Sequence, residues 1–193
     1  LSEKGYSRAT DIMSYEAILL DLEGPGSKER RNYQKYYFAI YGEPGKKGTW
    51  GLSVEGHHLS LNFTFEDGRM VDSTPQFFGL NPATLQKSYT VPTNRTGETQ
   101  VRFKESHRLL AAEEDAALAL FQSLNDAQKA QALFDSECPD DVMGAGEPQP
   151  AVIPAVGIAA KDLDDDQRKL LHDLLVIFQA NMPQDVALER LNL

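Results

Sequence analysis

The sequence predicts an α+β fold: one antiparallel β-meander of about four strands, an N-terminal helix before it and three to four C-terminal helices after it. Residues 49–78 alternate between apolar and polar side chains and turn at glycines, as a meander does. Residues 2–22 and the chain after residue 106 instead carry apolar residues at helical spacing. A length of 193 residues suits one domain, so we expect residues 1–193 to form a single α+β domain.

The elements before the meander follow from local composition. A helix is expected over residues 2–22, because apolar side chains recur every three or four positions and Gly24-Pro25-Gly26 follows. The basic run over residues 27–35 predicts a solvated connector. Residues 36–41 are aromatic and β-branched, which favours the first strand.

The meander requires a turn that changes the parity of its apolar residues. They occupy even positions in residues 50–54 and odd positions in residues 59–65, so one straight strand cannot place both sets on one face. A two-residue loop at Glu55-Gly56 would restore the parity and pair Val54 with His57. We therefore predict a hairpin with that loop.

The predicted hairpin has one apolar and one polar face. In this register Gly51 lies opposite Ser60 on the polar face, with Asn62 beside them, and its missing side chain leaves room for a ligand or another backbone. A solvated sheet face is the alternative interpretation. A second turn is expected at Asp67-Gly68, returning the chain as a strand over residues 70–78.

The adjacent histidines are the candidate functional residues. A cross-strand pair contributes only about 0.2–1 kcal/mol, whereas a buried imidazole without a partner costs about 1–3 kcal/mol, so sheet packing does not explain two of them. Consecutive strand residues point to opposite faces, and both can ligate one metal only if the turn distorts them. His58, with Ser60 and Asn62 on the polar face, is the stronger candidate. His57 is expected on the apolar face, as a core histidine bonded to backbone.

Two functions of different class remain open. The first is an enzyme in which His58 is a metal ligand or general base and Glu55 supports it. Its ligand would be held by residues of the polar face: Gly51, Ser60 and Asn62. A divalent metal would be bound by His58 and His57, with oxygen ligands from Glu55, Asp72 or Gln76. The second is a non-catalytic module whose polar face docks a small ligand, another domain or a second subunit.

Composition excludes several other classes. The net charge of −10 and the absence of a basic cluster argue against a nucleic-acid partner. No apolar run is long enough for a membrane span, so we expect a soluble protein, cytoplasmic or exported after removal of an upstream signal. Cys138 is the only cysteine and precludes an internal disulfide. The minimal motifs of P-loop, serine-hydrolase, Rossmann and zincin enzymes are missing.

The remaining chain alternates loops and helices. Residues 81–100 are polar with two prolines and predict an irregular loop, either a lid or an excursion. A helix is expected over residues 106–124, capped by Ser106, and a shorter one from Asn125 or Asp126 to Phe134. The buried stripe of the helix over residues 106–124 would consist of Leu110, Leu118, Phe121 and Leu124.

The last third of the chain follows the same logic. Residues 138–154 predict a second long loop. Asp164 and Gln167 form a capping box at the start of a helix that ends before Pro183. Its core stripe would consist of Leu170, Leu171, Leu174, Leu175 and Phe178. A final helix starts at Gln184 and finishes on uncapped leucines, which suggests that the native protein is longer.

Four segments also resemble a bacterial domain family of unknown function, domain-of-unknown-function family 3500: YYFAIYG, TWGLSVEGHHLSLNFTFEDG, FFGLNPA and RLLAAEEDAA. The most specific part is the Glu-Gly-His-His-Leu-Ser-Leu-Asn core at residues 55–62, and the similarity extends to the late helix DQRKLLHDLL. The resemblance implies no established activity. Family members continue with more strand-like sequence and a further His-x-His pair, which implies that this chain is the larger part of a longer protein.

Overall fold

A computed structural model describes residues 1–139, 141–142 and 155–192. The chain forms two compact units, residues 1–111 with 180–193, and residues 112–179, and each is described here by itself. The single domain expected over residues 1–193 stays a prediction. In chain order the elements are α1 (Glu3–Glu23), η1 (Pro25–Ser27), β1 (Tyr37–Tyr41), β2 (Thr49–Gly56), β3 (Leu59–Glu66), β4 (Arg69–Asp72), β5 (Gln76–Phe78), β6 (Tyr89–Pro92), β7 (Gln100–Phe103), α2 (Ala111–Ser123), α3 (Asp126–Ala132), η2 (Ala160–Asp162), α4 (Asp165–Gln179) and α5 (Gln184–Leu191).

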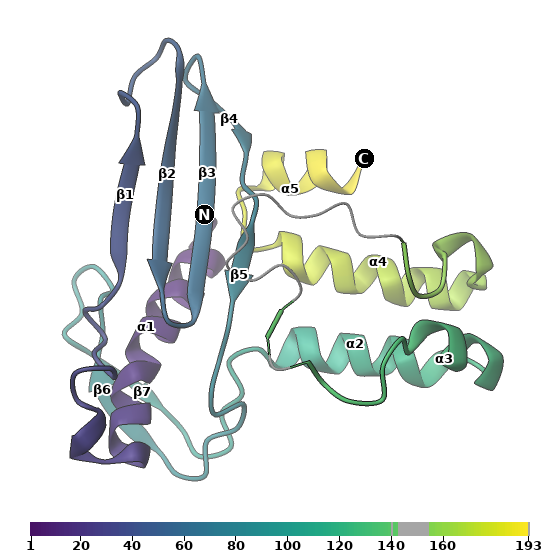
Figure 1. The fold of residues 1–193 in the computed structure, drawn as a ribbon, viewed down its shortest axis with the longest axis horizontal. Helices are drawn as coiled ribbons and strands as arrows, with labels where there is room; N and C mark the ends of the chain where they lie inside the picture. The colour runs from purple at the N-terminus through teal and green to yellow at the C-terminus, as the bar shows by residue number, and fades with distance from the viewer. Residues whose placement is uncertain (140, 143–154, 193) are drawn as a thin grey trace. The chain divides into compact units, whose positions relative to one another are not determined.

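The α+β class is confirmed. The first unit holds an antiparallel sheet in the order β1-β2-β3-β4, with β5 paired to β3 beside β4 (Figure 1). One long helix precedes this sheet in the chain, and α2 to α5 follow it. The sheet is therefore the meander that the alternation of residues 49–78 predicted.

The turn of the β2–β3 hairpin lies two residues later than predicted. Gly56 pairs with Leu59 and Val54 with Leu61, so the two-residue loop is His57-His58, and the predicted loop at Glu55-Gly56 and pairing of Val54 with His57 are wrong. The reason is a close approach of the Tyr36 ring: a Cβ on Gly56 would lie 2.2 Å from its Cδ1 atom. Gly56 is thus a strand residue that makes room for an aromatic ring, not a turn residue.

The face assignment survives this change, because a shift of two residues preserves parity. Leu59 and Leu61 are buried in one cluster with Ile12 and Met13 of α1, so this helix covers the apolar face. Burial of each such side chain contributes about 1.5–3 kcal/mol. The predicted position of Gly51 opposite Ser60 is wrong, since Gly51 pairs with Thr64.

The second turn is confirmed at Asp67-Gly68. Both residues have positive φ, 48° and 81°, as the common two-residue hairpin turn requires. The returning chain is interrupted where one continuous strand was expected, because the register shifts between Thr64 and Phe65 and only residues 69–72 and 76–78 pair with β3.

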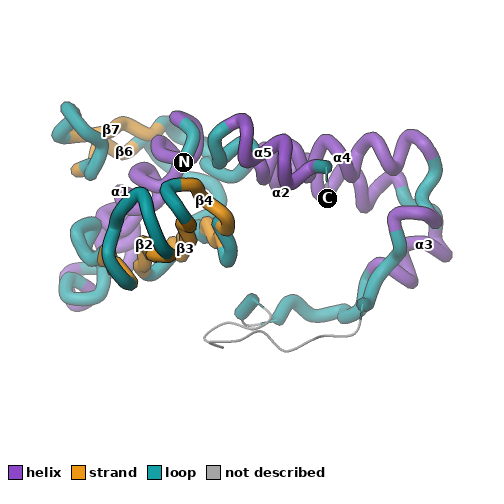
Figure 2. Tube along the Cα trace, turned by 90° about the horizontal axis from the view of Figure 1, so that it is seen from above, coloured by secondary structure: helices purple, strands orange, loops and turns teal. Residues whose placement is uncertain are grey.

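The segment predicted as an irregular loop over residues 81–100 contains strand β6 and leads into β7. These strands form a second hairpin, which lies on the other side of α1 from the main sheet (Figure 2). Val91 and Phe103 are buried with Tyr15 and Ile18 of α1. Prolines obscured the alternation of Tyr89 and Val91, yet Pro92 is tolerated because it ends a strand of a two-stranded sheet.

Helices α3 and α4 of the second unit begin at capping boxes. Asn125 caps α3 through a capping box with Gln128, and Asp164 and Gln167 form the predicted box at α4, with both bonds at 2.9–3.0 Å. The predicted cap at Ser106 is wrong: it has φ 64°, and its N–H donates to the carbonyl of Leu85. Helix α2 starts at Ala111, five residues later than predicted.

The predicted apolar stripes of α2 and α4 are only partly buried. Leu124 is buried, but Leu118, Phe121, Leu175 and Phe178 are 37–51% exposed. Their interpretation as core residues is wrong within the described residues, where all four side chains count as exposed. The loop predicted over residues 138–154 lies mostly outside the described residues.

Candidate functional site

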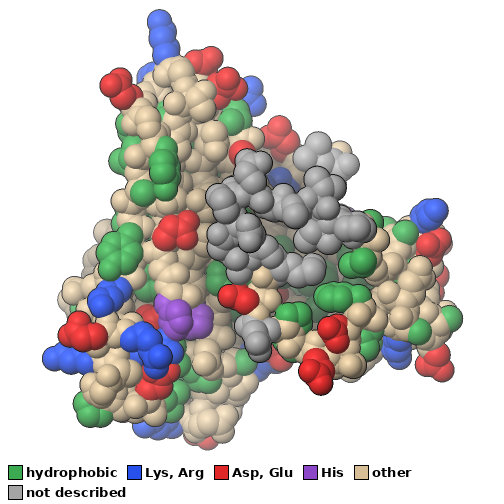
Figure 3. Space-filling view, in the orientation of Figure 1, with side chains coloured by type: hydrophobic (Ala, Val, Ile, Leu, Met, Phe, Trp, Pro, Cys, Tyr) green, Lys and Arg blue, Asp and Glu red, His purple; other side chains and the backbone are tan. Residues whose placement is uncertain are grey.

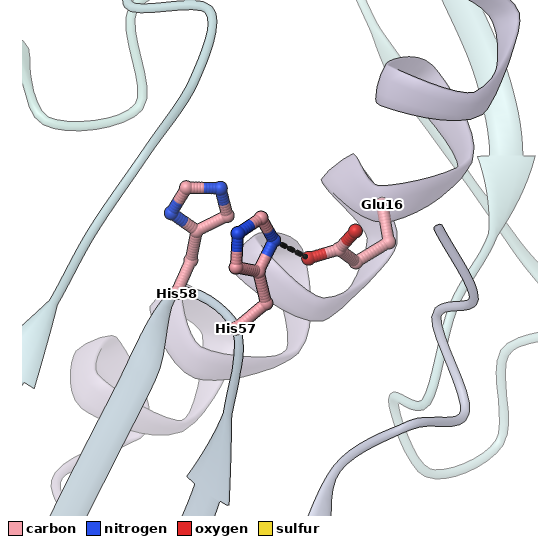
Figure 4. Close-up of side chains that lie close together, drawn as sticks. All are labelled: Glu16, His57 and His58. Carbon is pink, nitrogen blue, oxygen red and sulfur yellow. Dashed lines mark hydrogen bonds and ion pairs between the residues drawn. The ribbon is translucent and has the colours of Figure 1, made fainter. Parts of the chain in front are cut away.

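The tip of the β2–β3 hairpin and the middle of α1 together form the candidate site. Leu59 anchors the hairpin on Ile12 within the buried cluster. Glu16 follows Ile12 by one helical turn and so lies on the same face of α1. This places the Glu16 carboxylate beside His57 and His58 (Figure 4). Glu16 is only 2% exposed, which is rare for a carboxylate without a specific partner.

Three potential metal-binding side chains converge here. One ligand atom each from Glu16, His57 and His58 can be chosen so that all lie within 4.8 Å of one another. Nδ1 of His57 lies 3.1 Å from Oε1 of Glu16, and the two imidazole rings are 4.2 Å apart between centroids. Strand geometry would have separated the two rings onto opposite faces, but a two-residue turn does not impose that alternation.

Arg31 borders this cluster from the connector after α1. Its Nε and Nη2 atoms donate to the two carboxylate oxygens of Glu23 at 3.0 and 2.6 Å, a bidentate pair that fixes the guanidinium. The remaining Nη1 lies 3.5 Å from Oε2 of Glu16 and contacts Nδ1 of His57. The connector was predicted to be solvated; for Arg31, whose side chain is 7% exposed, that is wrong.

The contacts of His57 place opposite demands on one atom. Nδ1 must carry a proton to donate to Glu16 and must lack it to accept from Arg31, and a neutral ring nitrogen can do only one of these. If Nδ1–H donates to Glu16, Nε2 keeps its lone pair and can accept from Nη1 of Arg31 at 3.4 Å. The His57 side chain is 46% exposed, so a solute can reach it.

His58 is held in its neutral form. Burial, and then the nearby His57 and Arg31, lower the pKa of His58 to about 4. Its Nε2 is buried and has no hydrogen-bond partner among the described residues. On the other side of the ring, Gly79 packs closely, since a Cβ there would lie 3.2 Å from Nδ1 of His58. A neutral imidazole with an unused nitrogen is the form that binds metals.

The other predicted site residues form a separate row on the polar face. Ser60 donates to Glu55 at 3.1 Å, and Asn62 donates to Ser60 at 3.2 Å. Gly51 and Asn62 line a surface hollow of about 410 Å³. His58 was expected in this row, but it lies in the turn; nor is His57 the buried, backbone-bonded histidine that was expected.

Sequence reasoning missed Glu16 and Arg31. A signal for Glu16 existed, because it lies one turn after Ile12 on the apolar stripe of the N-terminal helix, where a carboxylate is rare unless it has a specific partner. Arg31 offered no signal in a run of charged residues.

The space-filling view shows histidine surface at the end of the hairpin, beside basic and acidic side chains (Figure 3).

The fold and site define an α+β protein with a histidine–carboxylate cluster at a hairpin tip. The whole chain, residues 1–193, matches the model of a family described as protein of unknown function (DUF3500), and the chain belongs to that family. No curated protein and no solved structure matches it. Among the described residues, no helix is long and apolar enough to cross a membrane.

Proposed function

We propose that the protein binds one divalent transition-metal ion through Glu16, His57 and His58, and that this ion is the centre of a metal-dependent reaction. The observation that carries the proposal is the convergence of three donor atoms within 4.8 Å. Two of them are adjacent in sequence, and the third comes from a different element. A solvated or structural histidine pair would not need a buried carboxylate at this distance.

The donor set favours particular metals and a particular kind of site. Two imidazoles and one carboxylate suit zinc, iron or manganese better than calcium or magnesium, which prefer oxygen ligands. Three protein ligands leave a coordination position open, as catalytic zinc sites do. An ion there supplies Lewis-acid chemistry, activating a bound water or polarising a substrate oxygen. The exposed edge of His57 provides access from solvent.

Arg31 is the main electrostatic argument against a cation at this position. Its charge is balanced by Glu23, because hydrogen bonds from Arg31 and Arg30 lower the pKa of that carboxyl to about 2 and keep it ionised. The two bonds to Glu23 also hold the guanidinium without help from Glu16. Metal binding therefore has to displace only the contacts of Nη1 with His57 and Glu16.

Metal content tests the proposal directly. The protein is purified without chelator, analysed for bound elements and titrated with Zn²⁺, Mn²⁺ and Co²⁺ by calorimetry. We expect about one ion per chain in the wild type, and at least a tenfold loss of affinity in His58→Ala and in Glu16→Gln. The matched control is His172→Ala on α4, whose side chain is 64% exposed. Equal binding by all four proteins, or no metal in any folded one, refutes the site.

The hollow on the polar face supports a second candidate, a non-catalytic module that binds a small ligand. Tyr41, Gly51, Asn62 and Thr64 contribute to its lining. A Cβ on Gly51 would lie 3.5 Å from the Tyr41 ring, an ordinary contact, so Gly51→Ala should fold. A compound that stabilises the wild type and His58→Ala equally, but not Gly51→Ala, would favour this function over the metal site.

A further inference from the structure

Strand β1 is an apolar, unpaired edge of the sheet. Only β2 pairs with it, so among the described residues its outer backbone groups have no strand partner (Figure 1). Its four large side chains are mostly exposed on both faces: Tyr37 65%, Phe38 70%, Ile40 59% and Tyr41 62%. Such an edge is a template for pairing with another strand.

The opposite edge carries the usual protections against such pairing, and β1 carries none. There β4 and β5 are four and three residues long, the register shifts next to Thr64, and Arg69 and Asp72 place charges on β4. By contrast, β1 pairs with β2 through five consecutive residues without a shift and contains no charged residue or proline. Among the described strands, β1 is therefore the edge that is open to a partner.

The sequence of β1, YFAIY, is chemically symmetric about Ala39. In an antiparallel pair of two such strands centred on Ala39, Tyr37 lies opposite Tyr41 of the other copy and Phe38 lies opposite its Ile40. Aromatic pairs and aromatic–β-branched pairs are the favourable cross-strand combinations. Every exposed large side chain of β1 thereby gains a neighbour. The two side chains of each opposing pair also point to the same side of the joined sheet, as an antiparallel ladder requires.

We propose that β1 pairs antiparallel with β1 of a second copy of this chain, about a two-fold axis at Ala39, to join two sheets into one. This pairing makes about four to six backbone hydrogen bonds, depending on which residues point outward. The two-fold axis keeps the helix-covered faces of both sheets on the same side, with Phe38 and Ile40 on that side and the tyrosines on the other. The arrangement closes after two copies and leaves only the protected edges exposed.

The area involved predicts the strength of the dimer. Aromatic side chains bury about 150–250 Å² each, so four side chains about two-thirds exposed offer roughly 500 Å² per copy. The total of about 1,000 Å² is at the lower limit of specific interfaces, and we expect a dissociation constant in the micromolar range. The net charge of −10 on each copy opposes association while the strand itself is uncharged, so added salt should strengthen the dimer.

The oligomeric state tests the proposal. In sedimentation over a concentration series, the wild type should shift from 21.4 kDa towards twice that mass. Phe38→Lys and Ile40→Lys should each raise the dissociation constant at least tenfold. The matched control, Val71→Lys on the opposite edge, starts from a similar exposure of 57% and should leave it unchanged. Circular dichroism confirms that each variant is folded. A wild type that stays monomeric, a dimer insensitive to both β1 variants, or growth beyond dimers overturns the proposal.

Cysteine cross-linking tests the register. In a Cys138→Ser background, Ala39→Cys should form a disulfide-linked dimer, because Cα atoms that face each other across the two-fold lie about 4.5–5.5 Å apart. Tyr37→Cys should not cross-link to itself, since the two copies of residue 37 lie about 13 Å apart along the strands. Mixing Tyr37→Cys with Tyr41→Cys should restore the link. Equal cross-linking of all single variants, or none for Ala39→Cys, contradicts pairing about Ala39.

Discussion

Replacing Gly56 by alanine tests the contact that determines the position of the hairpin turn. The added Cβ would lie 2.2 Å from Cδ1 and 2.3 Å from Cε1 of Tyr36, distances that no packed side chain tolerates. Tyr36 is only 7% exposed and belongs to the buried cluster of α1 and the sheet, so its ring cannot move without displacing other core residues. Overpacking of this kind costs about 1–3 kcal/mol, which exceeds the gain of about 0.4–1 kcal/mol from replacing glycine in the unfolded chain.

The matched control is Gly26→Ala, where no atom lies within 4 Å of the added Cβ. We expect Gly56→Ala to lower the free energy of unfolding by about 1–3 kcal/mol, and Gly26→Ala to change it by no more than about 0.5 kcal/mol. Urea denaturation followed by the fluorescence of Trp50, the only tryptophan, reports on this sheet. In a Tyr36→Ala background the cost of Gly56→Ala should disappear. If the two glycine variants are equally stable, the steric explanation of the turn position is refuted.

Three further predictions concern the first unit. Gly5→Ala should lower the free energy of unfolding by about 1–3 kcal/mol although alanine has the better helix propensity, because its Cβ would lie 2.1 Å from the carbonyl oxygen of Asn181 before α5. A urea denaturation midpoint equal to that of the wild type would contradict this packing. In the metal-free protein, Arg31→Gln should cost about 3–5 kcal/mol, because Glu16 stays buried without its arginine partner. Arg30→Gln, with a side chain 66% exposed, should cost less than about 1 kcal/mol, and similar losses for both variants would show that the Arg31 pair behaves as a surface pair. Burial lowers the pKa of His107, so below about pH 6.5 the unfolded state binds a proton at this residue more readily than the folded state. The free energy of unfolding should therefore fall as the pH drops below that value. His107→Asn should flatten this decline, and an unchanged slope would rule out His107 as its cause.

Hydrophobic periodicity predicted the parts of the fold that depend on one element at a time. The helix at residues 2–22, the strand at residues 36–41 and the turn at Asp67-Gly68 all lie within two residues of their predicted bounds. Each rests on side chains close in sequence, such as the two residues with positive φ in that turn. The β6–β7 hairpin was missed because its strands are four residues long and acquire their apolar partners only from α1.

The exposure of Leu118 and Leu175 shows a different limit of pattern reasoning. A helical stripe indicates which side chains share a face, but not whether another element covers that face. Both residues share their helix faces with other apolar residues as predicted, yet they are 51% and 44% exposed in the described chain. Burial is a tertiary property, and the sequence of a single helix does not contain it.

The position of the candidate site depends on the contact between the Tyr36 ring and Gly56, which the sequence does not predict. Glycine in a hairpin sequence indicates a turn, and with Glu55-Gly56 as the loop the two histidines were assigned to strand positions on opposite faces. The Tyr36 ring instead occupies the space beside Gly56, which keeps that residue in β2 and moves the turn onto His57 and His58. Tyr36 and Gly56 lie twenty positions apart in the sequence, so no local pattern reports the contact. Because both imidazoles then belong to the turn, they can face Glu16 together, and the argument that adjacent histidines cannot share a metal no longer applies.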